Sequence, residues 1–189
     1  MIRKLIDKLL GKAPAGTGKG ARIPLGRRVE VPASEHGIDP GLLDERAVRV
    51  VRTLQEAGHA AYIVGGAVRD LLVGRRPKDF DVATSAHPDV VRSLFRRSRI
   101  IGRRFQIVHV LCGAEMVEVS TFRAHFSREA DEDNRDDQGR MLSDNVFGTQ
   151  AEDAMRRDFT VNALFYDPVK EEVWDYVHGL KDLKSKKMV

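Results

Sequence analysis

The stretch from residue 62 to residue 84, YIVGGAVRDLLVGRRPKDFDVAT, constrains the fold more than any other part of this chain. Gly65 and Gly66 directly follow a short apolar run, and a helical pattern that contains Arg69 comes next. Asp79 and Asp81 then lie in a second apolar run, separated by one residue. Glycines allow a backbone to approach phosphate closely, and two carboxylates on one strand face can hold divalent cations. The stretch therefore predicts strand, glycine turn, helix and strand, and it indicates transfer of a nucleotidyl group from a triphosphate.

The composition is that of a globular chain without a membrane segment. Its 189 residues, 42% hydrophobic and 32% charged, suit one large domain or one and a half small ones. No apolar run approaches the roughly 18 residues that a membrane-spanning helix needs. The short apolar and basic start lacks the cleavage site of a signal peptide. A single cysteine, Cys112, excludes an internal disulfide framework and fits a reducing cytosol, so we expect a cytoplasmic location.

Positive charge is concentrated in two places. Residues 1–30 carry eight Lys or Arg against two acids, and residues 11–37 are rich in Gly, Pro and Lys. We therefore predict that residues 1–35 form a basic, disordered leader, which either contacts RNA or an anionic surface or is simply solvated. The second cluster lies within the folded part and consists of Arg92, Arg96, Arg97, Arg99, Arg103 and Arg104.

Apolar spacing predicts the elements of residues 36–189. Three- and four-residue steps predict a helix over 42–57, and shorter helical patterns cover 67–73 and 88–97. Thr149 and Glu152 form a capping box that begins a further helix. Apolar runs predict strands over 60–64, 79–83, 100–111, 116–122, 163–166 and 173–177. Residues 125–145 are predicted to be a loop, and the last residues contain no predicted element. This order is typical of an α+β fold with a mixed β-sheet flanked by helices.

Three acids are candidate metal ligands. Because strand side chains alternate, Asp79 and Asp81 share one face, with Cα atoms roughly 7 Å apart. Carboxylate oxygens suit Mg²⁺, and two such ions can activate an attacking hydroxyl and neutralise a leaving pyrophosphate. Sites of this kind use a third acid. Glu118, isolated between two valines in a β-run, is our candidate, and the alternative is a solvated residue at a sheet edge.

Two further segments are candidates for nucleotide binding. Gly65 and Gly66 open a helix, so free backbone N–H groups point outward there. Arg69, one turn later, can clamp a phosphate with its forked guanidinium, or it can pair with Asp70. The run RRDFTVN of residues 156–162 offers cations, an acid and an amide to a triphosphate and ribose, or it forms a surface ion-pair network. The candidates within it are Arg157, Asp158 and Asn162.

Four motifs in order, GGAVRD, DFDV, EVSTFR and RRDFTVNAL, resemble the bacterial poly(A) polymerase and tRNA CCA-adding nucleotidyltransferase family of the DNA polymerase beta superfamily. The resemblance covers about residues 36–189. It implies an α+β catalytic head and Mg²⁺-dependent transfer of AMP from ATP to RNA 3′ ends, with release of pyrophosphate. By position it implies that the metal ligands are Asp79, Asp81 and Glu118. It implies that the nucleotide-binding residues are Gly65, Gly66, Arg69, Arg157, Asp158 and Asn162.

The resemblance also separates sister activities. The segment GRRFQIVH of residues 102–109, the insert of residues 127–145 and the basic leader resemble the poly(A) polymerase branch, which we favour over the CCA-adding branch. A non-catalytic module that binds RNA through the basic leader and the arginine cluster is a further alternative. In this family a helical neck after the head selects the base, and further helices hold the RNA. Neither is present before residue 189, so we expect a catalytic head that adds nucleotides poorly alone.

Overall fold

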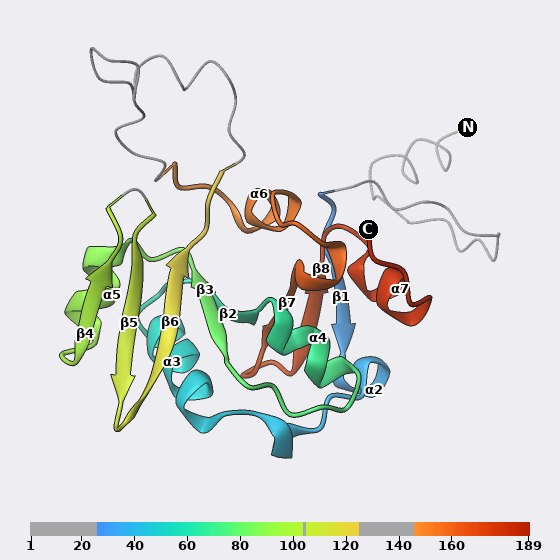
Figure 1. The fold of residues 1–189 in the computed structure, drawn as a ribbon, viewed down its shortest axis with the longest axis horizontal. Helices are drawn as coiled ribbons and strands as arrows, with labels where there is room; N and C mark the ends of the chain where they lie inside the picture. The colour runs from blue at the N-terminus through green and yellow to red at the C-terminus, as the bar shows by residue number, and fades with distance from the viewer. Residues whose placement is uncertain (1–25, 104, 125–145) are drawn as a thin grey trace, which may run out of the picture.

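The computed structural model describes residues 26–103, 105–124 and 146–189, which form one eight-stranded sheet with helices packed on it (Figure 1). The expected α+β fold with a mixed sheet flanked by helices is confirmed. The strand order is β1-β8-β7-β2-β3-β6-β5-β4. The strands are β1 (Val29–Pro32), β2 (Ala61–Val64), β3 (Asp81–Thr84), β4 (Ser98–Ile101), β5 (Ile107–Cys112), β6 (Glu115–Thr121), β7 (Leu164–Asp167) and β8 (Glu172–Asp175).

Side-chain caps fix where two of the helices begin. The carboxylate of Asp44 accepts hydrogen bonds from the backbone N–H groups of Arg46 and Ala47 in the first turn of α3 (Glu45–Glu56). The predicted capping box of Thr149 and Glu152 begins α6 (Gln150–Met155). The remaining helical segments are α2 (Ala33–His36), η1 (Pro40–Leu42), α4 (Gly66–Leu72), α5 (Pro88–Leu94), η3 (Thr160–Asn162) and α7 (Gly179–Lys184). None of the helices in the described ranges is long and apolar enough to cross a membrane.

The sheet separates two hydrophobic layers. Val82, Val108 and Val119 belong to the layer that α3 and α5 cover, and both helices lie behind β4–β6 in Figure 1. An aromatic cluster forms the other layer, where the ring of Tyr62 lies 4.7 Å from that of Trp174. Because strand side chains alternate, the residues between the valines of β3, β5 and β6 face away from α3 and α5. Those residues include two of the candidate acids, Asp81 and Glu118.

One pair of neighbouring strands is parallel, and it positions the acids. The strands β3 and β6 run in the same direction, while every other pair in the sheet is antiparallel. The register of the parallel pair sets Asp81 directly opposite Glu118. Directly paired residues share a face of the sheet, so two acids that are distant in sequence become neighbours.

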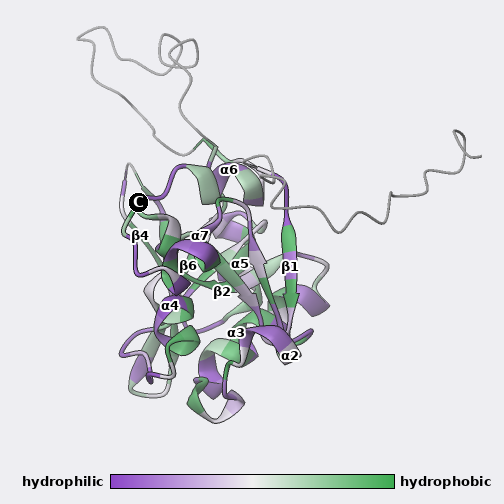
Figure 2. Cartoon of the chain, turned by 90° about the vertical axis from the view of Figure 1, so that its right-hand side faces the viewer, coloured by the Kyte–Doolittle hydropathy of each residue, from purple (hydrophilic) through white to green (hydrophobic). Residues whose placement is uncertain are grey.

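The ends of the chain contain more structure than we predicted. Residues 29–35, which we assigned to a disordered leader, form β1 and all but the last residue of α2, and β1 pairs with β8. Figure 2 shows the hydrophobic residues of β1 beside the hydrophilic α2. The last residues, for which no element was predicted, include α7. Leader residues 1–25 and the predicted loop of residues 125–145 lie outside the described residues.

Three predicted boundaries are also wrong. The strand expected over 100–111 is two strands, β4 and β5, because the chain turns at Gly102. Gly102 has a φ of 89°, and a Cβ there would lie 2.1 Å from the carbonyl oxygen of Phe105. The helix expected over 88–97 ends at Leu94. The strand expected over 79–83 begins only at Asp81, because its partner β2 ends opposite that residue.

Candidate active site

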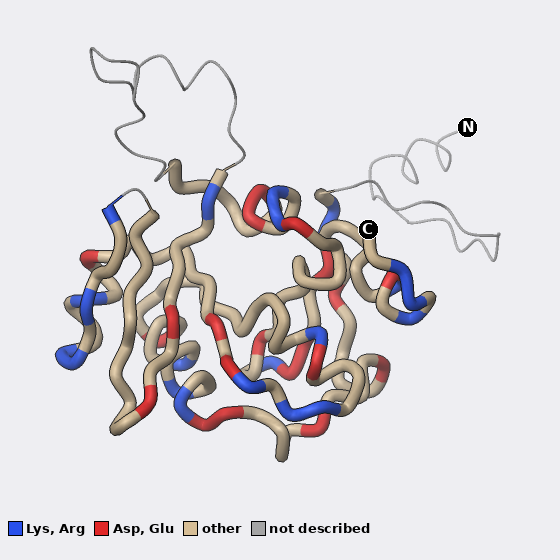
Figure 3. Tube along the Cα trace, viewed as in Figure 1, with Lys and Arg blue, Asp and Glu red and all other residues tan. Residues whose placement is uncertain are grey.

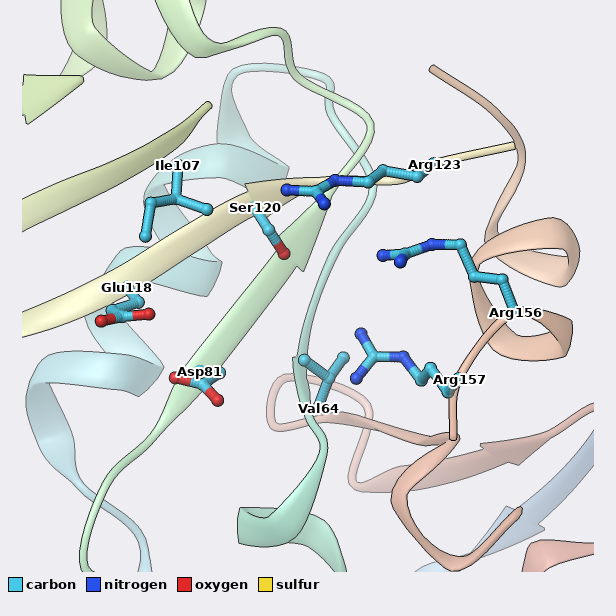
Figure 4. A pocket seen from close by; sticks show the side chains of 8 residues that line it. All are labelled: Val64, Asp81, Ile107, Glu118, Ser120, Arg123, Arg156 and Arg157. Atoms are coloured by element: carbon cyan, nitrogen blue, oxygen red, sulfur yellow. The ribbon is translucent and has the colours of Figure 1, made fainter. Parts of the chain in front are cut away.

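A pocket of about 250 Å³ opens where β3 and β6 run beside the segment that follows α6. Figure 4 shows two acids on one side of it and three arginines on the other. The lining residues are Val64, Asp81, Ile107, Glu118, Ser120, Arg123, Arg156 and Arg157. The pocket therefore has a negative end and a positive end within reach of one bound molecule.

The acidic end consists of Asp81 and Glu118, which β3 and β6 set side by side. Asp81 is open to solvent on one side, but the surrounding protein removes enough water to influence its charge. This desolvation, followed by the negative charge of Glu118, raises the pKa of Asp81, whereas Arg157 lowers it. Two carboxylates that repel each other in this way provide a site for a cation.

Asp79 lies outside the pocket lining, on the exposed segment before β3. Its negative charge still contributes to the raised pKa of Asp81, so it lies within electrostatic reach. In the described part of the chain, no group of three or more His, Cys, Asp or Glu side chains is arranged to hold a metal ion. Of the three acids that were predicted to meet, Asp81 and Glu118 lie side by side, and Asp79 acts on Asp81 through its charge.

His109, which was not among the predicted site residues, is the partner of Glu118 on β5. Its Nε2 atom lies 3.4 Å from Glu118 Oε1, and it forms no hydrogen bond with any residue of the described ranges. The motif EVSTFR indicated the acid, but only the strand register reveals that a histidine adjoins it.

The positive end of the pocket is organised by Asp153, a residue that the sequence did not single out. Its side chain is 1% exposed. Its Oδ1 accepts hydrogen bonds from Arg156 Nη2 at 2.7 Å and from the backbone N–H of Arg123 at 3.2 Å. Its Oδ2 accepts one from Arg157 Nη2 at 2.9 Å. One buried carboxylate thus holds two guanidinium groups opposite the acids. In the sequence, Arg156 and Arg157 follow Asp153 by three and four residues, a spacing that brings side chains together on one side of a helix. This spacing could have identified the cluster.

The glycine turn lies between the two ends of the pocket. Gly65 has a φ of 75°, and a Cβ there would lie 3.7 Å from Arg157 Nη1 and 4.0 Å from Asp81 Oδ2. Gly66 is the first residue of α4. A positive φ so close to both charged groups explains why glycine occupies position 65. The predicted glycine turn therefore adjoins the acids, as the sequence pattern required.

The remaining predicted nucleotide-binding residues lie beside this turn or outside the pocket. Arg69 pairs with Asp70 at 2.8 Å, the alternative raised by the sequence. Its Nη1 also donates a hydrogen bond of 3.0 Å to Asn162 Oδ1, so two predicted residues from distant motifs meet. Asp158 is exposed, is absent from the pocket lining, and accepts a hydrogen bond from the N–H of Phe159.

Comparison with known proteins places this arrangement in a family. Residues 61–189 match the family described as the Poly A polymerase head domain. Poly(A) polymerase I of Salmonella typhimurium is 49% identical over 158 residues, which cover 82% of this chain and 34% of that protein. The CCA-adding enzyme of Lactobacillus helveticus is 42% identical over 140 residues, which cover 74% of this chain and 33% of that protein.

The fold is also similar to that of a solved relative. The crystal structure of the Bacillus stearothermophilus CCA-adding enzyme in complex with CTP matches with a TM-score of 0.60 and 31% identity, covering 76% of this chain and 32% of that one. The chain spans about a third of the length of the curated relatives it matches. The family match covers well over half of this chain. The chain therefore belongs to the poly(A) polymerase head domain family.

Proposed function

We propose that the chain is the catalytic head of a polynucleotide adenylyltransferase, which transfers AMP from ATP to RNA 3′-hydroxyl ends in the cytoplasm. The observation that carries the proposal is the pocket in which Asp81 and Glu118 face Arg156 and Arg157. Carboxylates suit a divalent cation, and guanidinium groups suit a polyphosphate. The two ends of the pocket are therefore complementary to a nucleoside triphosphate that carries metal.

Asp81 and Glu118 would hold Mg²⁺, and Asp79, whose charge reaches Asp81, would serve as the third carboxylate. The residues fit this role because the pKa of Asp81 is raised partly by repulsion from Glu118, and a divalent cation relieves that repulsion. Bound Mg²⁺, as two ions, would supply positive charge that activates the attacking hydroxyl and neutralises the leaving pyrophosphate.

The other end of the pocket would bind the nucleotide. Arg156 and Arg157 would contact the triphosphate, with the turn at Gly65 and Gly66 close by. The resemblance assigns the ribose and the remaining phosphate contacts to Arg69, Asp158 and Asn162. In the reaction, the RNA 3′-oxygen loses its proton to solvent and bonds to the α-phosphorus, and the bond from that phosphorus to the bridging oxygen breaks. Pyrophosphate leaves with the electron pair of the broken bond.

The second candidate is a tRNA CCA-adding enzyme, because CCA-adding relatives share both the sequence and the fold. The higher identity to poly(A) polymerase I and the segment of residues 102–109 favour AMP addition. Incorporation of ATP and CTP on a tRNA that lacks its 3′ end separates these two candidates. A module that only binds RNA, with its basic leader on RNA or an anionic surface, would incorporate neither nucleotide.

The test is AMP incorporation into an RNA oligonucleotide by the full-length protein. Glu118→Gln and Asp81→Asn should abolish incorporation while circular dichroism remains unchanged. Glu115→Gln is the matched control, because Glu115 lies on the same strand but is 67% exposed and outside the pocket. Full turnover by the Glu118 variant, or equal losses for both glutamate variants, would remove the proposed mechanism.

A further inference from the structure

One row of side chains crosses four neighbouring strands and leads away from the acids. Arg99 on β4 pairs with His109 on β5, His109 pairs with Glu118 on β6, and Glu118 pairs with Asp81 on β3. Direct cross-strand partners share a face of the sheet. At a strand spacing of about 4.8 Å, the backbone of Arg99 lies roughly 14 Å from that of Asp81.

The face that carries this row is exposed at several of its residues. Val108 and Val119 of the same strands point the other way, into the layer covered by α3 and α5. Ile101 and Met116 share the face of the row, since they lie two residues from Arg99 and Glu118 in their strands, and they are 41% and 49% exposed. We call this surface of β4–β6, with Arg99, Ile101, His109 and Met116, the primer face.

The outer border of the primer face is basic. Figure 3 shows basic positions at the β4 end of the sheet and the acids of β6 and β3 nearer its centre. β4 is the last strand of the sheet, and Arg96, Arg97 and Arg103 next to it are exposed. Arg99 is exposed and forms no ion pair with any residue in the described ranges. An exposed cation in line with the active site, with no ion-pair partner among the residues that the structure describes, is suited to an anion that also reaches the site.

We propose that the primer face binds the last nucleotides of a single-stranded RNA whose 3′ end enters the acidic pocket, with Arg99 on an upstream phosphate. This proposal rests on the proposed function, because that function requires an RNA 3′-hydroxyl at Asp81 and Glu118. Arg99 lies beyond the terminal nucleotide, so it contacts the RNA backbone rather than the reacting atoms. The exposed Ile101 and Met116, on either side of the row, offer apolar surface to the bases of the strand.

The test compares RNA binding by Arg99→Ala and Arg99→Glu with binding by the matched control Arg92→Ala. Arg92 is an exposed arginine of α5, the helix on the opposite face. Fluorescence anisotropy with a labelled oligoadenylate is measured over a range of salt concentrations. R99A should weaken binding about fivefold, which corresponds to about 1 kcal/mol, and it should reduce the salt slope by about one. R99E should weaken binding further, and neither variant should change ATP affinity.

Substrate length supplies the positional test. R99A should show the full loss of RNA affinity with the long oligoadenylate. It should show no loss with a dinucleotide, because a dinucleotide occupies only the pocket. Equal RNA affinity of R99E and wild type would overturn the proposal and leave the face to a protein partner. An equal loss with the dinucleotide would also overturn it. If wild type incorporates AMP and R99E binds RNA normally, only the primer face fails. If wild type incorporates no AMP with Mg²⁺ present, the proposed function itself fails.

Discussion

Replacing Asp153 by Asn tests whether one buried carboxylate organises the positive end of the pocket. The substitution keeps the shape of the side chain but removes its charge, and it turns one acceptor oxygen into an NH₂ donor beside a guanidinium. Removing one member of a buried ion pair costs about 3–5 kcal/mol. Arg156 and Arg157 are 30% and 17% exposed, so water recovers part of their interactions. We therefore expect the lower limit of that range, about 3 kcal/mol of unfolding free energy.

The assay is urea and thermal unfolding combined with ATP titration. For a chain of this size, a loss of about 3 kcal/mol lowers the unfolding midpoint by roughly 6–12 °C. The released arginines are attracted to Asp81 and Glu118, so ATP affinity should fall about tenfold, or ~1.4 kcal/mol. Asp89→Asn, at an exposed position in the first turn of α5, is the matched control. Substitutions at ordinary surface positions change the free energy of unfolding by about 0.5 kcal/mol or less. A D153N variant whose unfolding free energy differs from that of wild type by no more than this would refute the reasoning.

Three further substitutions test other parts of the site. Gly65→Ala should lower the free energy of unfolding by about 1–2 kcal/mol because alanine resists a positive φ. Differential scanning calorimetry measures this loss, and Gly74→Ala, at a second glycine with a positive φ, serves for comparison. Asn162→Ala should raise the KM for ATP without lowering the melting temperature by more than a few degrees, because Arg69 keeps its pair with Asp70; an unchanged KM would contradict a nucleotide-binding role. Because the folded state raises the pKa of Asp81, its protonation favours the folded protein as pH falls through that pKa, while Mg²⁺ binding weakens. Arg157→Gln removes the charge that lowers this pKa, so Mg²⁺ affinity in calorimetric titrations should fall at a higher pH than in wild type; an identical pH profile would show that Arg157 does not influence Asp81.

Local signals predicted the elements around the site well. The apolar run, the twin glycines and the next apolar run gave β2, α4 and β3, and Thr149 with Glu152 gave the start of α6. The continuous apolar pattern concealed the division between β4 and β5, since only the turn at Gly102 separates them. The edge strand β1 was missed because four residues depend on pairing with β8, at the other end of the sequence.

The candidate site was predictable only where a motif named its residues. Asp81 and Glu118 were expected to meet because a two-metal site uses a third acid and because the family resemblance places one at Glu118. The strand register that brings them together is a tertiary property. No motif marked Asp153 or His109 as a site residue. Their significance depends on burial and on cross-strand pairing, which local sequence patterns do not specify.

The parallel pairing of β3 with β6 makes the acidic site depend on correct folding of a long segment. Glu118 cannot lie beside Asp81 until α5, β4, β5 and β6 have all been synthesised and packed. A slip of one residue in β6 would turn Glu118 into the layer of valines and bring Val117 or Val119 to the open face. A chain with misaligned strands would therefore lose its paired carboxylates altogether, so metal-dependent chemistry is confined to molecules that have completed the sheet in register.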